Sequence, residues 1–165
     1  MRGIIVALFS LVLAACSVSY SFTGADIPAE AKTFSVSYFG NSTALAGPQY
    51  RQQITEGLKD FLLGQTPLNL AKNQGDLLFS GTVTKYDVRP IALQTGDQGA
   101  RQRLTIALKV TYVNSFDEKK SFEQTFTRFA DFDTNQAFDS VEEALIEEIN
   151  EQLIQDIFNA SVGNW

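Results

Sequence analysis

The chain has 165 residues, 13 of them Phe, and a formal net charge of −6 at pH 7. This length suits one domain with one core, the aromatic content excludes a disordered chain, and the acidic balance argues against a nucleic-acid partner. With no His and a single Cys, the composition excludes histidine-centred catalysis, an internal disulfide and the usual zinc sites.

The N-terminus has the pattern of a secretory signal peptide. After Arg2, residues 4–15 are apolar and uncharged, but this stretch is shorter than the about 20 residues of a membrane-spanning helix. The run Leu13-Ala14-Ala15-Cys16 matches the bacterial lipobox, and its Cys is the only one in the chain. We therefore predict that residues 1–15 are removed and that Cys16 carries a covalent lipid anchor. The alternative is an ordinary signal peptide followed by an incidental Cys.

Residues 16–32 are predicted to be a lipidated lead-in, and residues 33–165 a single domain. The domain begins with an alternating strand over residues 33–38 and a loop over 41–47. Pro48 is expected to open an amphipathic helix that extends to residue 63. Its apolar side chains recur every fourth residue, at Tyr50, Ile54, Leu58 and Leu62. Gly64 is expected to close this helix in the left-handed conformation, and Pro67 to prevent its continuation.

Three strands and a helix are predicted to follow. A short element over residues 70–76 leads into a long strand over 77–88, with a bulge near Gly81. After a connection over 94–100, the clearest alternation of the chain predicts a strand through Leu104, Ile106, Leu108, Val110 and Tyr112. A polar tip over 115–120 then turns the chain back into a partner strand over 121–131.

The last helix is predicted to open at a capping box formed by Ser140 and Glu143. Its apolar stripe consists of Val141, Leu145, Ile149, Leu153 and Ile157, and its other face is strongly acidic. That acidic face is either simply solvated or steers the protein towards a basic partner. The order of elements predicts an α+β fold with two helices packed on one face of a four-stranded, mostly antiparallel or mixed sheet.

Two charged patterns are candidates for function. The predicted central strands carry Arg89, Arg101, Arg103 and Lys109, which could bind phosphates or anionic sugars, or could be ordinary residues of a solvated sheet face. Asp131 and Asp133 could bind a hard cation or serve a carboxylate-dependent hydrolase. Their alternative interpretation is a polar strand end with scattered acidic residues.

Several segments resemble the LptE family of lipopolysaccharide-assembly lipoproteins, most closely its Bacteroidota branch. The likeness begins at Cys16 and covers essentially the whole mature chain. It is carried by Tyr20-Ser21-Phe22-Thr23-Gly24, Lys32-Thr33-Phe34-Ser35-Val36, Arg103-Leu104-Thr105-Ile106, Asp117-Glu118-Lys119-Lys120, Phe129-Ala130-Asp131-Phe132-Asp133 and Glu147-Glu148-Ile149-Asn150-Glu151-Gln152.

The resemblance implies an outer-membrane lipoprotein without catalytic activity and without a cofactor other than the lipid on Cys16. Such a protein plugs and helps to assemble the LptD β-barrel, lies at the periplasmic side and in the barrel lumen, and assists lipopolysaccharide delivery to the cell surface. Basic residues bind lipopolysaccharide in this family, so Arg89, Arg101, Arg103 and Lys109 are candidates by local charge. The alternative function is an accessory lipoprotein of another envelope transport or secretion complex.

Overall fold

A computed structural model describes residues 27–44, 46–91 and 100–163. The elements follow in the order β1 (Thr33–Val36), β2 (Gly40–Asn41), α2 (Pro48–Gln65), β3 (Asn69–Leu70), β4 (Leu77–Ile91), β5 (Arg101–Asn114), a short 3-10 turn (Glu118–Lys120), β6 (Phe122–Asp133) and α3 (Phe138–Ser161). The predicted α+β class is confirmed. The predicted Cys16 anchor lies outside the described residues.

The strands form one mixed sheet with the order β3, β1, β4, β5, β6, and β2 also pairs with β4. Strands β1 and β2 run parallel to β4, and β3 runs parallel to β1. Strands β4, β5 and β6 form an antiparallel meander. The prediction of four strands was wrong, because the described residues form six. Strands β2 and β3 are two residues long each, too short to produce a period in the sequence.

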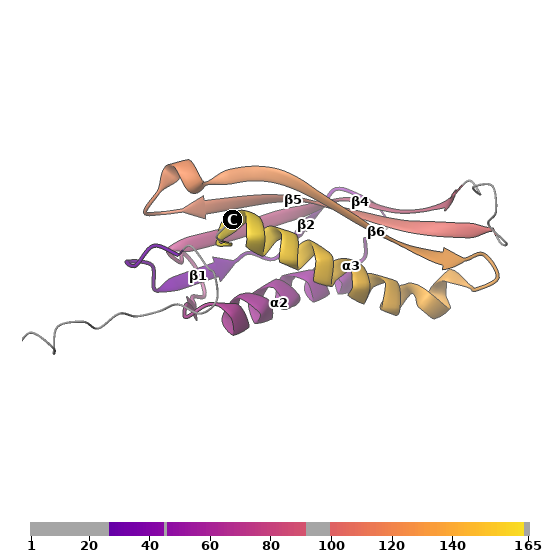
Figure 1. Cartoon of the computed structure of the whole chain (residues 1–165), viewed down its shortest axis with the longest axis horizontal. Coiled ribbons are helices and arrows are strands. Elements are labelled where there is room, and N and C mark those ends of the chain that lie inside the picture. Colours follow the sequence, from indigo (N-terminus) through magenta and orange to yellow (C-terminus); the bar gives the residue numbers. More distant parts are fainter. Residues whose placement is uncertain (1–26, 45, 92–99, 164–165) are drawn as a thin grey trace, which may run out of the picture.

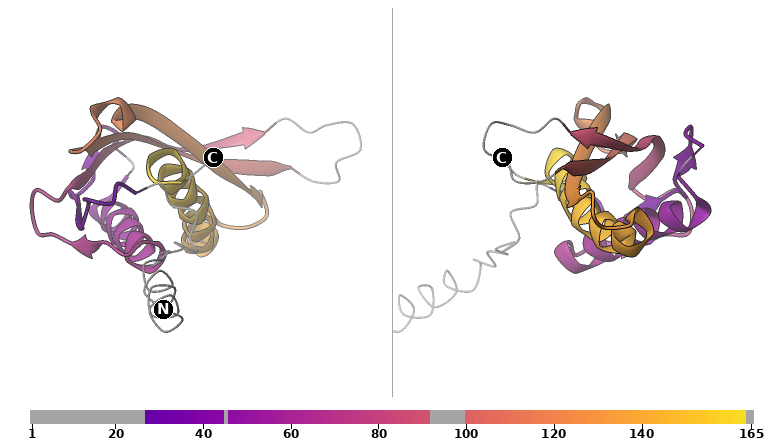
Figure 2. Two further views of the ribbon diagram at one scale, coloured as in Figure 1. Left: turned by 60° about the vertical axis from the view of Figure 1, so that its left-hand side comes forward. Right: turned by 90° about the vertical axis from the view of Figure 1, so that its right-hand side faces the viewer.

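Both helices cover the same face of this sheet, and the core lies between the two layers (Figure 1 and Figure 2). The predicted alternation of β5 is confirmed, since the side chains from Leu104 to Tyr112 at every second position are buried. Helix α2 buries its predicted stripe, and α3 buries residues from Leu145 to Phe158 along its inner face. Among the described residues, no helix is long and apolar enough to cross a membrane. The other face of the sheet carries no helix from the described part of the chain.

The end of α2 differs from the prediction. Gly64 does not close the helix, which continues to Gln65 and is followed by Thr66 in an extended conformation. The Thr66 backbone N–H and hydroxyl both donate to the Leu62 carbonyl, at 3.0 and 2.7 Å, so the last turn is satisfied without a left-handed glycine. Pro67 favours an extended residue before it, which places the stop at Thr66.

The bulge in β4 lies at Thr84 rather than near Gly81. The register with β5 shifts between Val83 and Lys85, and the Thr84 hydroxyl donates to the Ala107 carbonyl at 3.2 Å. Gly81 has a different role, because a Cβ there would lie 2.4 Å from Cε1 of the buried Phe39 ring. The alternation is therefore interrupted at Gly81 because the Phe39 ring packs there, whereas the extra residue of the bulge is Thr84, three positions further on.

The predicted capping box does not form, because α3 begins earlier, at Phe138. The residue before it, Ala137, makes no side-chain cap. The Ser140 hydroxyl instead donates to the Ala137 carbonyl at 2.6 Å, inside the first turn. Phe138 packs against the core and Phe132, with ring centroids 5.8 Å apart, and this contact extends the helix backwards by one turn.

Candidate functional site

We call the sheet face that no described helix covers the open face. It carries the four predicted cations, which lie in two separate places. Arg89 and Arg103 lie directly opposite one another on β4 and β5, and Arg101 faces Ile91 two pairs further on. These three arginines therefore gather at the end of the β4–β5 pair. Lys109 is six residues from Arg103 along β5, roughly 20 Å away at the usual rise of a strand.

Carboxylates from neighbouring positions pair with three of these cations. Distances between nitrogen and oxygen are 2.6 Å for Arg89 with Asp87, 2.6 Å for Arg103 with Asp131 and 2.7 Å for Lys109 with Glu123. The guanidinium of Arg101, which is exposed, contributes to the lowered pKa of Asp131. A count of charges along β4 and β5 alone does not reveal that Arg103 and Lys109 are paired, because their partners Asp131 and Glu123 belong to β6.

Arg103 is held more firmly than the other cations of the open face. Its guanidinium donates to both carboxylate oxygens of Asp131, at 2.6 and 2.9 Å, and lies 3.6 Å from the centroid of the Phe129 ring. This fork-shaped hydrogen bonding lowers the pKa of Asp131. Since the side chain of Arg89 is 74% exposed and that of Arg103 34%, Arg89 is the more accessible of the two.

The geometry does not favour a carboxylate-dependent hydrolase at Asp131 and Asp133. A general acid needs a raised pKa, whereas the hydrogen bond from Arg103 lowers the pKa of Asp131. Among the described residues, no group of three or more acidic, His or Cys side chains is arranged to hold a metal ion. Asp131 therefore orients Arg103, which is a structural task.

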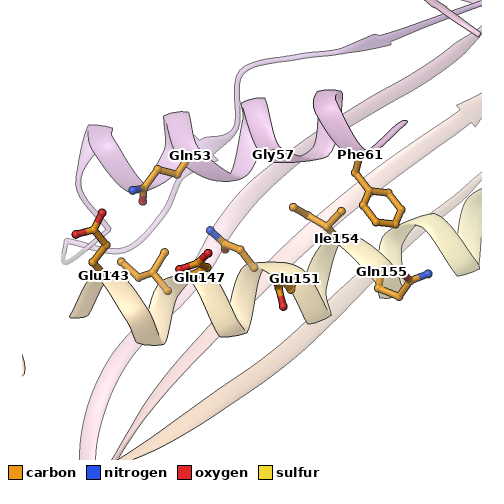
Figure 3. Close-up of a pocket in the computed structure, with 10 residues that line it drawn as sticks. Gln53, Gly57, Phe61, Glu143, Glu147, Glu151, Ile154 and Gln155 are labelled. Atoms are coloured by element: carbon orange, nitrogen blue, oxygen red, sulfur yellow. The ribbon is translucent and has the colours of Figure 1, made fainter. Parts of the chain in front are cut away.

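A groove of about 660 Å³ lies between α2 and α3. Figure 3 shows Gln53, Gly57 and Phe61 of α2 on one wall, facing α3. The α3 wall consists of Glu143, Ile146, Glu147, Asn150, Glu151, Ile154 and Gln155. A smaller cavity of about 290 Å³ shares Gln53, Glu143 and Ile146 with it and continues the groove towards the start of α3.

The sequence indicated the acidic face of the last helix but not this groove. Its rim is acidic because glutamates recur every fourth residue of α3. Its floor is apolar because it is formed by the half-buried Phe61 and the buried Ile146 and Ile154. The signal that could have revealed it is Gly57, a glycine in the interior of an amphipathic helix, which removes a side chain from the helix contact.

Two partly buried hydrogen bonds lie beside the smaller cavity, which Tyr50, Tyr86 and Glu142 help to line. The Tyr86 hydroxyl of β4 donates to the Glu142 carboxylate of α3, and the Tyr50 hydroxyl of α2 donates to the Asn150 side chain at 3.2 Å. The two rings meet edge to face, 5.5 Å between centroids. Burial raises the pKa of both phenols, so they stay protonated and serve as hydrogen-bond donors. These contacts tie the sheet to both helices.

The fold and the site define a small α+β domain with an open sheet face and a grooved helical face. The same fold occurs in uncharacterized lipoprotein B from Nitrosomonas europaea, with 13% identity, a TM-score of 0.55 and coverage of 87% of this chain and 88% of that chain. It also occurs in a hypothetical protein from Chlamydia trachomatis, with 6% identity, a TM-score of 0.51 and coverage of 79% and 98%. No curated protein matches the sequence.

The profile of the lipopolysaccharide-assembly family LptE matches residues 31–161. The chain belongs to this family, as its sequence resemblance predicted. The matched range begins at the buried Ala31 and ends at the last residue of α3, so it covers the described core except Val162.

Proposed function

We propose that this protein is the lipid-anchored plug and assembly subunit of an LptD-like β-barrel in the outer membrane, where it assists lipopolysaccharide delivery to the cell surface. The observation that carries the proposal is the family match over residues 31–161. The lipobox that ends at Cys16 supplies the anchor on the periplasmic side of that membrane. The role is one of binding and positioning, without catalysis and without a cofactor other than the lipid.

The surface chemistry of the domain supports this role. The lumen of an outer-membrane barrel is polar, so a plug needs a polar exterior and a core of its own. Here most apolar side chains of the sheet pack against the helices, and the open face presents hydroxyls and paired charges together with the exposed Val113 and Phe129. The hydroxyls come from Thr82, Thr105, Thr111, Thr125 and Thr127, which alternate with the buried positions of their strands.

We further propose that Arg89, Arg101 and Arg103 contact the phosphates of lipopolysaccharide, with Lys109 as a separate candidate. Guanidinium groups bind phosphate through two parallel hydrogen bonds, and three of them converge at the end of β4 and β5. Arg101 is the first candidate because Asp87 and Asp131 already pair with the other two. Arg101→Ala should weaken binding of lipopolysaccharide several-fold. Lys59→Ala, which removes a cation from α2, is the matched control.

Affinity purification from detergent-solubilised envelopes tests the main proposal. The tagged, lipid-modified protein should recover one large β-barrel protein of the LptD kind, and its depletion should admit bulky antibiotics that an intact outer leaflet excludes. Recovery of the subunits of another transport or secretion complex would instead support an accessory lipoprotein of that complex. Recovery of neither would count against both proposals.

A further inference from the structure

One end of the molecule carries most of the exposed apolar side chains. Of the six large hydrophobic residues that are well exposed in the described part of the chain, four lie near this end: Leu63, Leu70, Val113 and Phe116. The other two, Tyr38 and Phe129, lie elsewhere and have polar neighbours. The Tyr38 hydroxyl donates to the Pro48 carbonyl, and Phe129 lies under Arg103. We call the first group the apolar end.

Strand pairing brings the apolar end together from distant parts of the sequence. Thr33 at the start of β1 is paired with Asn69, which precedes Leu70, and Phe34 is paired with Leu77. Leu77 is also paired with Asn114, next to Val113. The C-terminus of α2, which carries Leu63, lies at this same end of the domain, and so does the β5–β6 turn (Figure 1).

The β5–β6 turn holds Phe116 in a fixed position. The side-chain oxygen of Asn114 accepts hydrogen bonds from the backbone N–H groups of Phe116 and Asp117, at 3.0 and 3.1 Å. The Asp117 carboxylate in turn accepts from the Lys119 N–H at 3.1 Å. The Phe116 ring is 47% exposed at the tip of this closed turn. Its exposure is therefore built into the turn.

The described chain also starts at the apolar end. The Asp76 carboxylate binds the backbone N–H groups of Lys32 and Thr33, both at 2.9 Å, next to the β5–β6 turn. Ile27, which packs on the core just before this point, is only eleven residues after Cys16. Eleven residues reach at most on the order of 40 Å, so a lipid on Cys16 holds the membrane surface within that distance of this end.

Charge separates this end from the rest of the helical layer. The acidic residues of α3 run from Asp139 to Asp156, with no basic residue in that helix, and its last turn is uncharged. Phe116 is followed by two acidic and two basic residues, Asp117 to Lys120, which balance in charge, and Lys72 is exposed two residues after Leu70. Anionic lipid headgroups therefore repel the first turns of α3 more than they repel the apolar end.

We propose that, before the domain enters a barrel, the apolar end docks on the bilayer that holds the lipid of Cys16, with Phe116 and its apolar neighbours in the headgroup region. The occupant of this surface is phospholipid, because exposed apolar side chains with flanking lysines suit the interface of a membrane. Docking sets the domain upright on its anchor, with the three arginines of the open face directed away from the bilayer. The inference rests on lipidation of Cys16, which is part of the proposed function.

Fluorescence of a single indole tests this orientation in the full, lipid-modified protein. In a Trp165→Phe background, Phe116→Trp reports on the apolar end, and Phe129→Trp, at a ring of nearly equal exposure (48% against 47%), reports on the open face. The protein is reconstituted in vesicles of phosphatidylethanolamine and phosphatidylglycerol that contain brominated lipid. The indole introduced at position 116 should shift its emission to shorter wavelength and lose intensity to the brominated lipid, while that at position 129 should not.

Three outcomes are distinguishable. If the mass of the intact protein shows no acyl chains, Cys16 is not lipidated, and the premise taken from the proposed function is wrong. With the acyl mass present, equal quenching at both positions would mean that the domain lies flat, and quenching at neither would mean that it stands clear of the bilayer. Either of these two results would overturn end-on docking while leaving the proposed function intact.

Discussion

At the scale of single residues, Gly81 shows how one missing side chain shapes the core. A Cβ at this position would lie 2.4 Å from Cε1 of Phe39, and Phe39 is completely buried. Gly81→Ala should therefore destabilise the protein by about 1–3 kcal/mol, since the ring cannot move without disturbing its neighbours. The free energy of unfolding in urea measures this loss.

Gly64→Ala is the matched control for that substitution. Nothing lies within 4 Å of a Cβ at Gly64, and the residue is inside the last turn of α2. The control should be neutral or stabilise by up to about 1 kcal/mol, because alanine favours a helix over glycine. Equal losses in both variants would show that the Phe39 ring does not need the space above Gly81.

Asp76 makes stability depend on pH. Its carboxylate accepts hydrogen bonds from the Lys32 N–H, the Thr33 N–H and the Thr33 hydroxyl, and these hold its pKa below the ordinary value of 3.8. A carboxyl whose pKa is lowered by folding adds stability above its unfolded pKa and loses it as the pH falls through the folded pKa. The protein should therefore lose stability as the pH falls below about 4.

The Asp76→Asn variant isolates this contribution. Thermal melts from pH 7 to pH 2 should show a flatter acid dependence for the variant than for the parent protein, because the amide does not titrate. Asp60→Asn, at an exposed position of α2, controls for the loss of one negative charge. If the two variants had the same acid dependence, the hydrogen bonds to Asp76 would not be the source.

At the scale of elements, α2 and α3 are separated by the groove at Gly57. A Cβ there would lie 3.0 Å from Cδ1 of Ile154, a terminal methyl that borders the groove and can turn into it. Gly57→Ala should therefore stabilise the protein by about 0.5–1 kcal/mol, because the helix gains more than the methyl loses. A raised midpoint of thermal unfolding would confirm this expectation. A loss of stability as large as that of Gly81→Ala would show that Ile154 and the two helices cannot move to accept the methyl group.

The strands and helices were predictable to different degrees. The alternation of β5 and the apolar stripes of α2 and α3 were predicted correctly. Each element buries one face over many residues, which produces a period in the sequence. The start of α2 at Pro48 was also predicted correctly, but the end of α2 and the start of α3 were not. Helix α2 ends through the hydroxyl of Thr66, and α3 begins through the contact of Phe138 with Phe132. Such contacts involve particular partners, so periodicity does not reveal them.

At the scale of the whole molecule, one hydrophobic core joins every major element. Buried residues from Ala31 to Val162 form one continuous cluster that spans the sheet and both helices. We expect a single cooperative unfolding transition, with circular dichroism of the helices and fluorescence of the buried tyrosines changing together. Transitions at different denaturant concentrations would show that the long β4–β5–β6 meander unfolds separately from the helical layer.

The sequence by itself determined the fold class and the candidate cations, because these depend on periodicity and local charge along the chain, and the likeness of its segments to LptE identified the family. Only the tertiary structure decided which cations meet. It gathers Arg89, Arg101 and Arg103, separates Lys109 and supplies Asp131 and Glu123 from β6. The groove and the apolar end were decided in the same way. Their residues are far apart in the sequence, and only the packing of helices and the register of strands brings them together.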